Sequence, residues 1–240
     1  MGLFDIFTSF ESDDQPDWRQ SVDECLSGDE VACEWVEVTA AALPRNLVGT
    51  GTRLSAAGYE TAATRLGVPV ASIKAVCAVE ALGSGFLNSG RLKILYEAHK
   101  FSAATGRKYD KTHPNVSSKS WNKALYGAGG EHQYTRLKQA MALNETAALA
   151  SASWGMFQIL GSNYAAAGFP SVHAFVYDQL QGEDNQLLAF CSFVKANSTM
   201  HKALVKRDWA TFARLYNGPG YKANAYDTKL AAAFKKYGGK

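Results

Sequence analysis

The chain has 240 residues, of which 47% are hydrophobic and 20% charged, a composition typical of a globular protein with a substantial core. No apolar stretch is long enough for a membrane-spanning helix, because Lys, Asp or Glu interrupts each long run. The net charge of +3 hides an asymmetry: residues 1–52 hold 11 acidic and 2 basic residues, a net of −9, and the remainder holds 11 acidic and 23 basic residues, a net of +12. The sequence therefore predicts a short acidic N-terminal extension, residues 1–52, ahead of a basic body, residues 53–240.

The extension begins with seven mostly apolar residues that include Asp5 and have no basic leader, which predicts that it is not a secretory signal. Cys25 and Cys33 leave two alternatives open, a disulfide and a pair of free thiols. We expect the extension to dock a delivery partner or to shield the basic body before release. Two short helices and a glycine-threonine linker are predicted at about 19–26, 30–42 and 49–52.

Helical patterns dominate the basic body. Gly67 and Pro69 are typical of the end of one helix and the start of the next. Residues 92–101 fit either a strand or a helix, and residues 102–130 are rich in Gly, Ser, Asn and Lys, which predicts a long surface loop. The predicted helices cover about 55–66, 70–82, 131–149, 183–196, 208–216 and 223–237. We therefore expect a mainly α-helical domain with a small β-hairpin or strand element.

One carboxylate stands where an apolar helix gives way to a glycine-rich turn. Glu80 follows the run Ile73-Lys-Ala-Val-Cys-Ala-Val and precedes Gly83-Ser-Gly85. Burial and the negative end of the helix dipole both disfavour the ionised form, so both would raise the pKa of Glu80. Such a group can hold a proton near neutral pH and donate it to a leaving oxygen. From position alone, two alternatives stay open: an ion pair with Lys or Arg, and a side chain that reaches solvent from the last helical turn.

Three short motifs then occur in order: Val79-Glu80-Ala81 with Gly83-Ser-Gly85, Ser151-Ala-Ser-Trp-Gly-Met-Phe-Gln158, and Leu215-Tyr-Asn-Gly-Pro-Gly-Tyr221. This order resembles the lysozyme-like superfamily of goose-type lysozymes and lytic transglycosylases. The chain is still more similar to the N-acetylmuramidase domain of phage and prophage endolysins, whose further hallmarks match residues 90–101 and 208–219. The resemblance covers about residues 54–237 and implies a lysozyme-like helical domain.

Two positions depart from the family pattern. Ala81-Leu82 follows the acid where the family usually has Ser or another small residue, and Leu92 follows Gly90-Arg91 where the family commonly has Pro. Neither departure removes a proton donor.

The resemblance implies a peptidoglycan hydrolase that cuts the β-1,4 bond between N-acetylmuramic acid and N-acetylglucosamine, with Glu80 as the general acid. Glu97 is the candidate for a second catalytic carboxylate, because it lies in a family hallmark. An ion pair of Glu97 with Lys93 or Arg91 is the alternative. Weaker candidates for the second carboxylate are Asp110, Glu131 and Asp227.

The other site residues also come from the resemblance. It implies that Tyr216 orients Glu80 by a hydrogen bond, and that Gln158 and Asn217 contact sugar hydroxyls or N-acetyl groups. Ser153 and Trp154 are expected to bind substrate as well, although core packing stays open for Trp154. Candidates for stacking on a sugar ring are Trp121, Tyr126 and Tyr134.

Several functions remain in competition with hydrolysis. A lytic transglycosylase would use the sugar's own 6-hydroxyl and needs a single acid, and a non-catalytic wall-binding or virion component needs none. The basic body alone does not predict nucleic-acid binding, because no recognisable motif accompanies it. No residue cluster predicts a metal or cofactor: His99 and His132 are expected to be structural or surface residues, and Cys77 and Cys191 core residues. We expect a monomer, made without a secretory signal, that acts on the periplasmic cell wall after release, injection or delivery on a virion.

Overall fold

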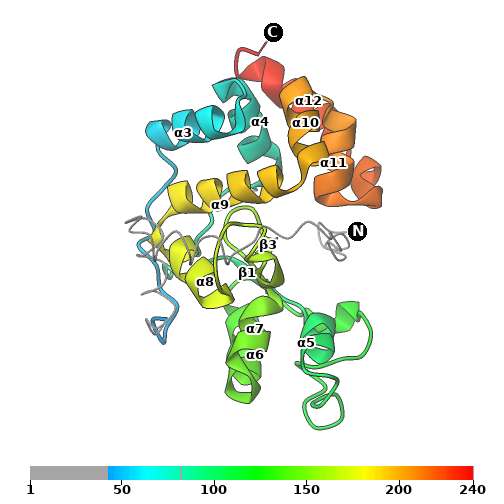
Figure 1. Ribbon diagram of the computed structural model, residues 1–240. Coiled ribbons are helices and arrows are strands. Elements are labelled where there is room, and N and C mark those ends of the chain that lie inside the picture. Colours follow the sequence, from blue (N-terminus) through cyan, green and yellow to red (C-terminus); the bar gives the residue numbers. More distant parts are fainter. Residues whose placement is uncertain (1–42, 82, 240) are drawn as a thin grey trace, which may run out of the picture.

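The computed structural model describes residues 43–81 and 83–239, which are mostly helical around a small antiparallel sheet. Figure 1 shows two groups of helices, one above and one below, with α9 and the strands between them. The helices of the described residues are α3 (Ala56–Leu66), α4 (Val70–Glu80), α5 (Ala98–Ala104), α6 (Glu131–Leu143), α7 (Glu145–Ala150), α8 (Val172–Gln181), α9 (Glu183–Ala196), α10 (Ser198–Lys206), α11 (Trp209–Asn217) and α12 (Tyr226–Lys236). Three 3-10 turns are η1 (Lys123–Leu125), η2 (Gly161–Asn163) and η3 (Pro219–Asn224). The predicted mainly α-helical architecture is confirmed.

The upper group brings helices from the early part of the described chain against helices from its C-terminal part. Helix α4 packs against α12, and α11 packs against both α10 and α12. In Figure 1 the cyan α4 and the orange to red α10–α12 accordingly lie together. The C-terminal third of the chain therefore covers the helix that ends at Glu80.

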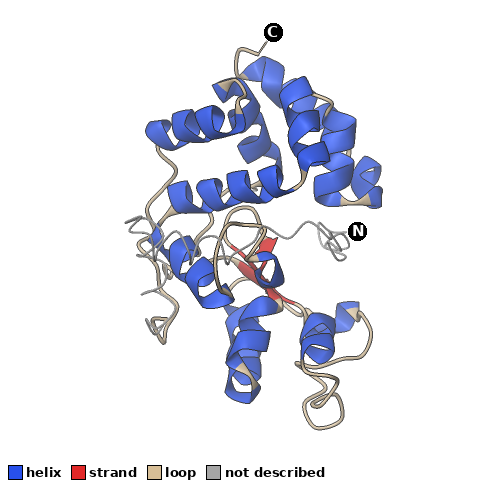
Figure 2. Ribbon diagram, viewed as in Figure 1, coloured by secondary structure: helices blue, strands red, loops and turns tan. Residues whose placement is uncertain are grey.

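The sheet lies between the two groups and is drawn in red in Figure 2. Its strands, β1 (Ile94–Tyr96), β2 (Ala152–Trp154) and β3 (Ile159–Leu160), pair antiparallel in the order β1-β2-β3, with Leu95 opposite Ser153 and Ser153 opposite Leu160. Every strand residue is buried. The ambiguous segment 92–101 is thus a strand followed directly by α5, and the expected small β element is confirmed.

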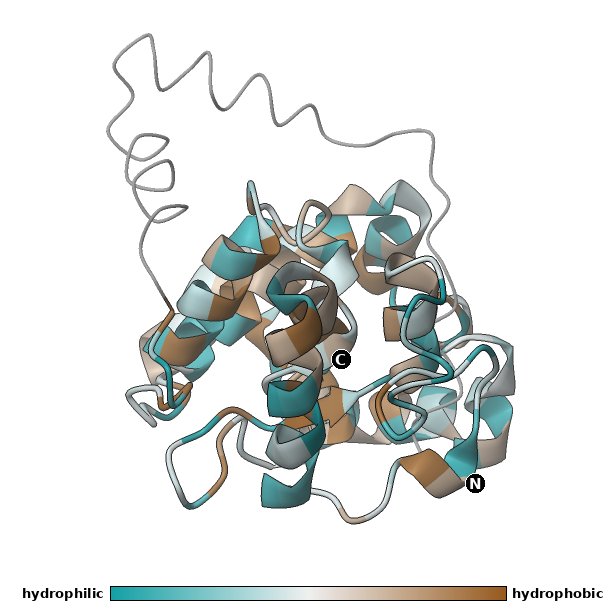
Figure 3. Ribbon diagram, turned by 90° about the horizontal axis from the view of Figure 1, so that it is seen from below, coloured by the Kyte–Doolittle hydropathy of each residue, from teal (hydrophilic) through white to brown (hydrophobic). Residues whose placement is uncertain are grey.

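Helix α9 forms the centre of the core, as its apolar sequence predicted. Phe190 is fully buried and stacks on Phe157 with ring centroids 4.4 Å apart, and it forms a T-shaped contact with the ring of Tyr216. Cys77 and Cys191 are buried free thiols, which confirms them as core residues. Figure 3 shows hydrophobic and hydrophilic segments alternating along the helices, as helices around a shared core require. Within the described part of the chain no single helix could cross a membrane by its length and composition; only α3 and α4 together could, as a pair bent by 109°.

Three local features differ from the sequence prediction. Helix α8, capped by Ser171, and helix α10, capped by Asn197, were not predicted. The single helix expected over 131–149 is two helices, because Asn144 leaves the helical conformation and its side chain accepts a hydrogen bond from Ala147 N at 2.9 Å. All three features are N-caps, which favour the start of a new helix over the continuation of an old one.

Residues 43–52, called the strap below, pack on the body although the sequence analysis placed them in the extension. Leu43 and Leu47 are buried in the core. The strap is also held by backbone hydrogen bonds, from Gly49 N to Gly90 O, from Thr50 N to Leu180 O and from Glu183 N to Thr52 O. The body therefore begins earlier than residue 53. The helices predicted at 19–26 and 30–42, together with Cys25 and Cys33, lie outside the described residues.

Candidate active site

Glu80 is the last residue of α4 and is 5% exposed. Its Oε1 accepts a hydrogen bond from Asn217 Nδ2 at 2.8 Å. Burial raises the pKa of Glu80 to about 7, against the smaller lowering effects of Asn217 and Lys229. The ion pairs formed among the described residues do not include Glu80. The carboxyl group can therefore carry a proton near neutral pH, as its position in the sequence predicted.

The neighbour of Asn217 makes a different contact from the one expected. Tyr216 is 4% exposed, and its hydroxyl donates to Phe157 O at 2.8 Å. Burial raises the pKa of Tyr216 well above its ordinary value, and the charge of Glu80 raises it further, so the hydroxyl keeps its proton. The hydrogen bond to Glu80 described above comes from Asn217, and a Tyr216–Glu80 hydrogen bond stays a prediction. Tyr216 ties α11 to the Ser-Trp-Gly-Met-Phe-Gln segment.

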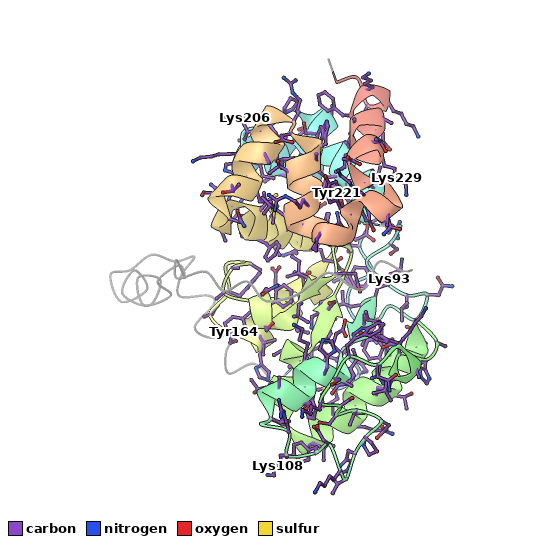
Figure 4. The ribbon with its side chains drawn as sticks, turned by 90° about the vertical axis from the view of Figure 1, so that its right-hand side faces the viewer. Lys93, Lys108, Tyr164, Lys206, Tyr221 and Lys229 are labelled. Atoms are coloured by element: carbon purple, nitrogen blue, oxygen red, sulfur yellow. The ribbon has the colours of Figure 1, made fainter. Side chains whose placement is uncertain are left out.

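Glu80 faces a pocket of about 250 Å³ between the two groups of helices. In Figure 4 one pocket residue, Lys93, lies at this junction, below Lys229 of α12. The pocket surface is mostly apolar, and Glu80 is the one carboxylic acid among the described residues that line it. The lining residues are Glu80, Ala81, Leu87, Lys93, Ile94, Leu95, Gly129, Gly130, Gly155, Met156 and Gln158.

Gln158 lies in the pocket wall in a left-handed backbone conformation, with φ of +50°. Its Nε2 donates to Gly155 O at 2.8 Å and to Lys93 O at 3.2 Å, so the amide nitrogen ties its own loop to the residue before β1. A substrate contact of the side-chain oxygen stays a prediction. Few non-glycine residues adopt positive φ, and such strain is concentrated at functional sites.

Two residues of the same motif are not in the pocket lining. Ser153 and Trp154 belong to β2 and are 3% and 0% exposed. The Trp154 indole N–H donates to Leu149 O at 2.9 Å, which satisfies its polar atom inside the core. Trp154 thus packs in the core, as the alternative in the sequence analysis had it. A substrate contact of Ser153 or Trp154 stays a prediction. Tyr134, a candidate for sugar stacking, is likewise buried and donates to Leu92 O.

Glu97 directly follows β1 and is 8% exposed. Its Oε2 accepts a hydrogen bond from the Tyr126 hydroxyl and lies 3.4 Å from His99 Nδ1. Glu97 closely follows the pocket residues Lys93, Ile94 and Leu95 in the sequence, but it does not itself line the pocket. The structure therefore places Glu97 beside the pocket, held by Tyr126.

The weaker carboxylate candidates have other partners. Asp110 accepts hydrogen bonds from the hydroxyls of Ser102 and Ser117. Glu131 pairs with Arg91 at 2.7 Å, so Arg91 is the partner of Glu131 and not of Glu97. None of the three candidates Asp110, Glu131 and Asp227 lines the pocket. No group of three or more His, Cys, Asp or Glu residues in the described chain is arranged to hold a metal ion.

Comparisons with known proteins agree with this geometry. The family model of N-acetylmuramidases matches residues 69–238. The chain is also similar to the endolysin of Burkholderia phage AP3, whose crystal structure superposes with a TM-score of 0.73 at 40% sequence identity, over 77% of this chain and 70% of that chain. No curated protein matches the sequence. The chain therefore belongs to the N-acetylmuramidase family and is a peptidoglycan-hydrolysing enzyme of the phage endolysin type.

Proposed function

We propose that this protein cleaves the β-1,4 bond between N-acetylmuramic acid and N-acetylglucosamine, with Glu80 as the general acid. The observation that carries the proposal is the buried Glu80 carboxyl in the pocket, whose pKa burial raises to about 7. Near that pH a large fraction of the molecules hold the proton that the leaving oxygen needs.

The surroundings of Glu80 suit both halves of the reaction. Before bond cleavage, burial keeps the carboxyl protonated. After the proton has left, the hydrogen bond from Asn217 at 2.8 Å stabilises the carboxylate. Gln158 Oε1 is placed to accept a hydrogen bond from a sugar hydroxyl or an N-acetyl N–H, and the apolar wall restricts water around the reacting bond.

A lytic transglycosylase is the second candidate, favoured by one observation. Glu80 is the one carboxylic acid among the described lining residues, and Glu97 already accepts a hydrogen bond from Tyr126. A site with one acid suits attack by the sugar's own 6-hydroxyl, whereas hydrolysis usually employs two carboxylates. Glu97 therefore decides between the two reactions.

Product analysis tests both candidates. Purified sacculi are digested with the wild type, Glu80→Gln, Glu97→Gln and the exposed control Glu60→Gln, and the fragments are identified by mass spectrometry. We expect reducing N-acetylmuramic acid ends from the wild type and the control, and none from Glu80→Gln. Full activity of Glu97→Gln with 1,6-anhydro ends would establish the transglycosylase. Unchanged lysis by Glu80→Gln would exclude the catalytic assignment and favour a wall-binding component.

For the cellular setting we propose action on the periplasmic wall after release from the cytoplasm, as for an endolysin. The proposed docking or shielding role of the acidic extension needs a deletion that stops at residue 42, because the strap is part of the body. Loss of residues 1–42 without a change in activity or sacculus affinity would dismiss that role.

A further inference from the structure

A second cavity lies behind the pocket wall. It measures about 280 Å³ and, like the pocket, is lined by Ala81 and Met156. Gly83, which follows the helix end at Glu80, lines it too. Ala81 and Met156 therefore have open space on both sides. Together with residues 83–85 and Gly155 they form a segment called the rear wall below. A segment that lies between two open spaces needs hydrogen bonds to its neighbours to stay in place.

Glu183, the first residue of α9, holds one half of the rear wall. Its side chain is 1% exposed, and its Oε1 accepts hydrogen bonds from Ser84 Oγ and Gly85 N, both at 2.9 Å. Its Oε2 accepts from Leu54 N at 2.9 Å, and Arg53 lies 3.3 Å from Oε1. One buried carboxylate thus holds the turn after Glu80 through two charge-assisted hydrogen bonds.

Gln186, almost one helical turn further along α9, holds the other half. It is fully buried, its Oε1 accepts from Met156 N at 2.7 Å, and its Nε2 donates to Gln179 O at 3.0 Å. A Cβ atom at Gly85 would lie 2.0 Å from this Oε1, and one at Gly155 2.8 Å from it. These two glycines therefore leave the room in which Gln186 reaches the wall.

From these contacts we propose that Glu183 and Gln186 are positioning residues for Glu80. Three residues apart on one helix face, they fix both halves of the rear wall, and so set the place of Glu80 and keep water out from behind it. This inference rests on the proposed role of Glu80 as general acid.

The proposal has a consequence that a purely structural role lacks. If the wall loosens, water from the second cavity reaches Glu80 and solvates its carboxylate. Burial is the largest cause of the raised pKa of Glu80, so added water lowers that pKa. Glu80 then loses its proton at a lower pH than in the wild type, and the basic limb of the pH profile of activity moves to lower pH.

The test compares Glu183→Gln, Gln186→Leu and Ser84→Ala with Asp184→Asn as a matched control. Asp184 lies in the same turn of α9 and accepts hydrogen bonds from Ser55 N at 2.9 Å and Ser55 Oγ at 2.6 Å, so it anchors α3 instead of the wall. The measurements are kcat, KM and the pH dependence of kcat/KM on sacculi, together with Tm and near-UV circular dichroism.

We expect the wall variants to lose about tenfold or more in kcat with little change in KM, because small misplacements of a catalytic group are costly. Their basic limb should move to lower pH. The control should lower Tm but leave kcat and the basic limb unchanged. Ser84→Ala decides the matter if the α9 variants do not fold, because it leaves α9 intact and removes the Ser84 bond to Glu183, together with the bond from Phe86 N to Ser84 Oγ at 3.0 Å.

The proposal is overturned if folded wall variants keep the wild-type kcat and basic limb, or if Asp184→Asn shifts that limb equally. Failure of the proposed function would look different. In that case the wild type releases no glycan fragments, or Glu80→Gln remains active.

Discussion

Replacing Glu80 by Gln should stabilise the protein at high pH. The folded state raises the pKa of Glu80 from an ordinary 4.5 to about 7. At ~1.4 kcal/mol for each pH unit, ionising Glu80 in the folded protein costs about 3 kcal/mol more than in the unfolded chain. Because the folded pKa is the higher one, this part of the stability is fully present below pH 4.5 and is lost as the pH rises through 7. Gln carries no such proton, so its contribution does not change with pH.

Urea unfolding of the wild type and Glu80→Gln at pH 4, 6 and 8 measures this effect. The variant should be more stable by about 3 kcal/mol at pH 8, with a gap that shrinks towards pH 4. The exposed control Glu60→Gln should show no such pH dependence. An equal gap at pH 4 and pH 8, or a variant less stable than the wild type at pH 8, would mean that Glu80 ionises at little cost. The general-acid assignment would then lose its physical basis.

Two further substitutions probe the site. Asn217→Leu removes the hydrogen-bond donor to the Glu80 carboxylate, so the pKa of Glu80 should rise by about 1 to 2 pH units. The basic limb of the pH profile of kcat/KM should move to higher pH by the same amount, and kcat should fall. Asn185→Leu, which removes a 2.8 Å amide–carboxylate bond away from the pocket, should leave the limb in place, and an unmoved limb in Asn217→Leu would contradict the reasoning. Gly85→Ala should cost about 1 to 3 kcal/mol in thermal unfolding, because its Cβ would lie 2.0 Å from a buried amide oxygen. Gly220→Ala, with nothing within 4 Å of its Cβ, should cost less, and equal losses would contradict the crowding argument.

The position of Glu80 could be predicted because its signals are local. An apolar run, one carboxylate and a glycine-rich turn are adjacent in the sequence, and burial at a helix end follows from that order. The roles of Tyr216 and Asn217 could not be separated in the same way. They are neighbours at the end of α11, and only the packing of α11 against α4 and the 155–158 segment shows which one reaches Glu80.

Other parts of the site depend on contacts between distant residues. Glu183 accepts a hydrogen bond from Gly85, 98 positions earlier, and Gln186 accepts one from Met156, 30 positions earlier. The residues next to Glu183 and Gln186 in the sequence therefore do not indicate these partners. The same holds for Trp154, whose place in a family motif favours a functional role, while its full burial assigns it to the core. Helices α8 and α10, in contrast, are preceded by the N-caps Ser171 and Asn197, and these residue types are local signals in the sequence.

The strap determines where this chain can be cut. The family match begins at residue 69, and the change in composition suggests a boundary near residue 53. A shortened protein that starts at either point would lose the buried Leu43 and Leu47, and Gly90 O and Leu180 O would lose their backbone donors. Since Val48 also bridges to Arg91, close to the pocket residue Leu87, the loss would reach one edge of the active site. A shortened protein that keeps this edge of the site must therefore retain residues 43–52.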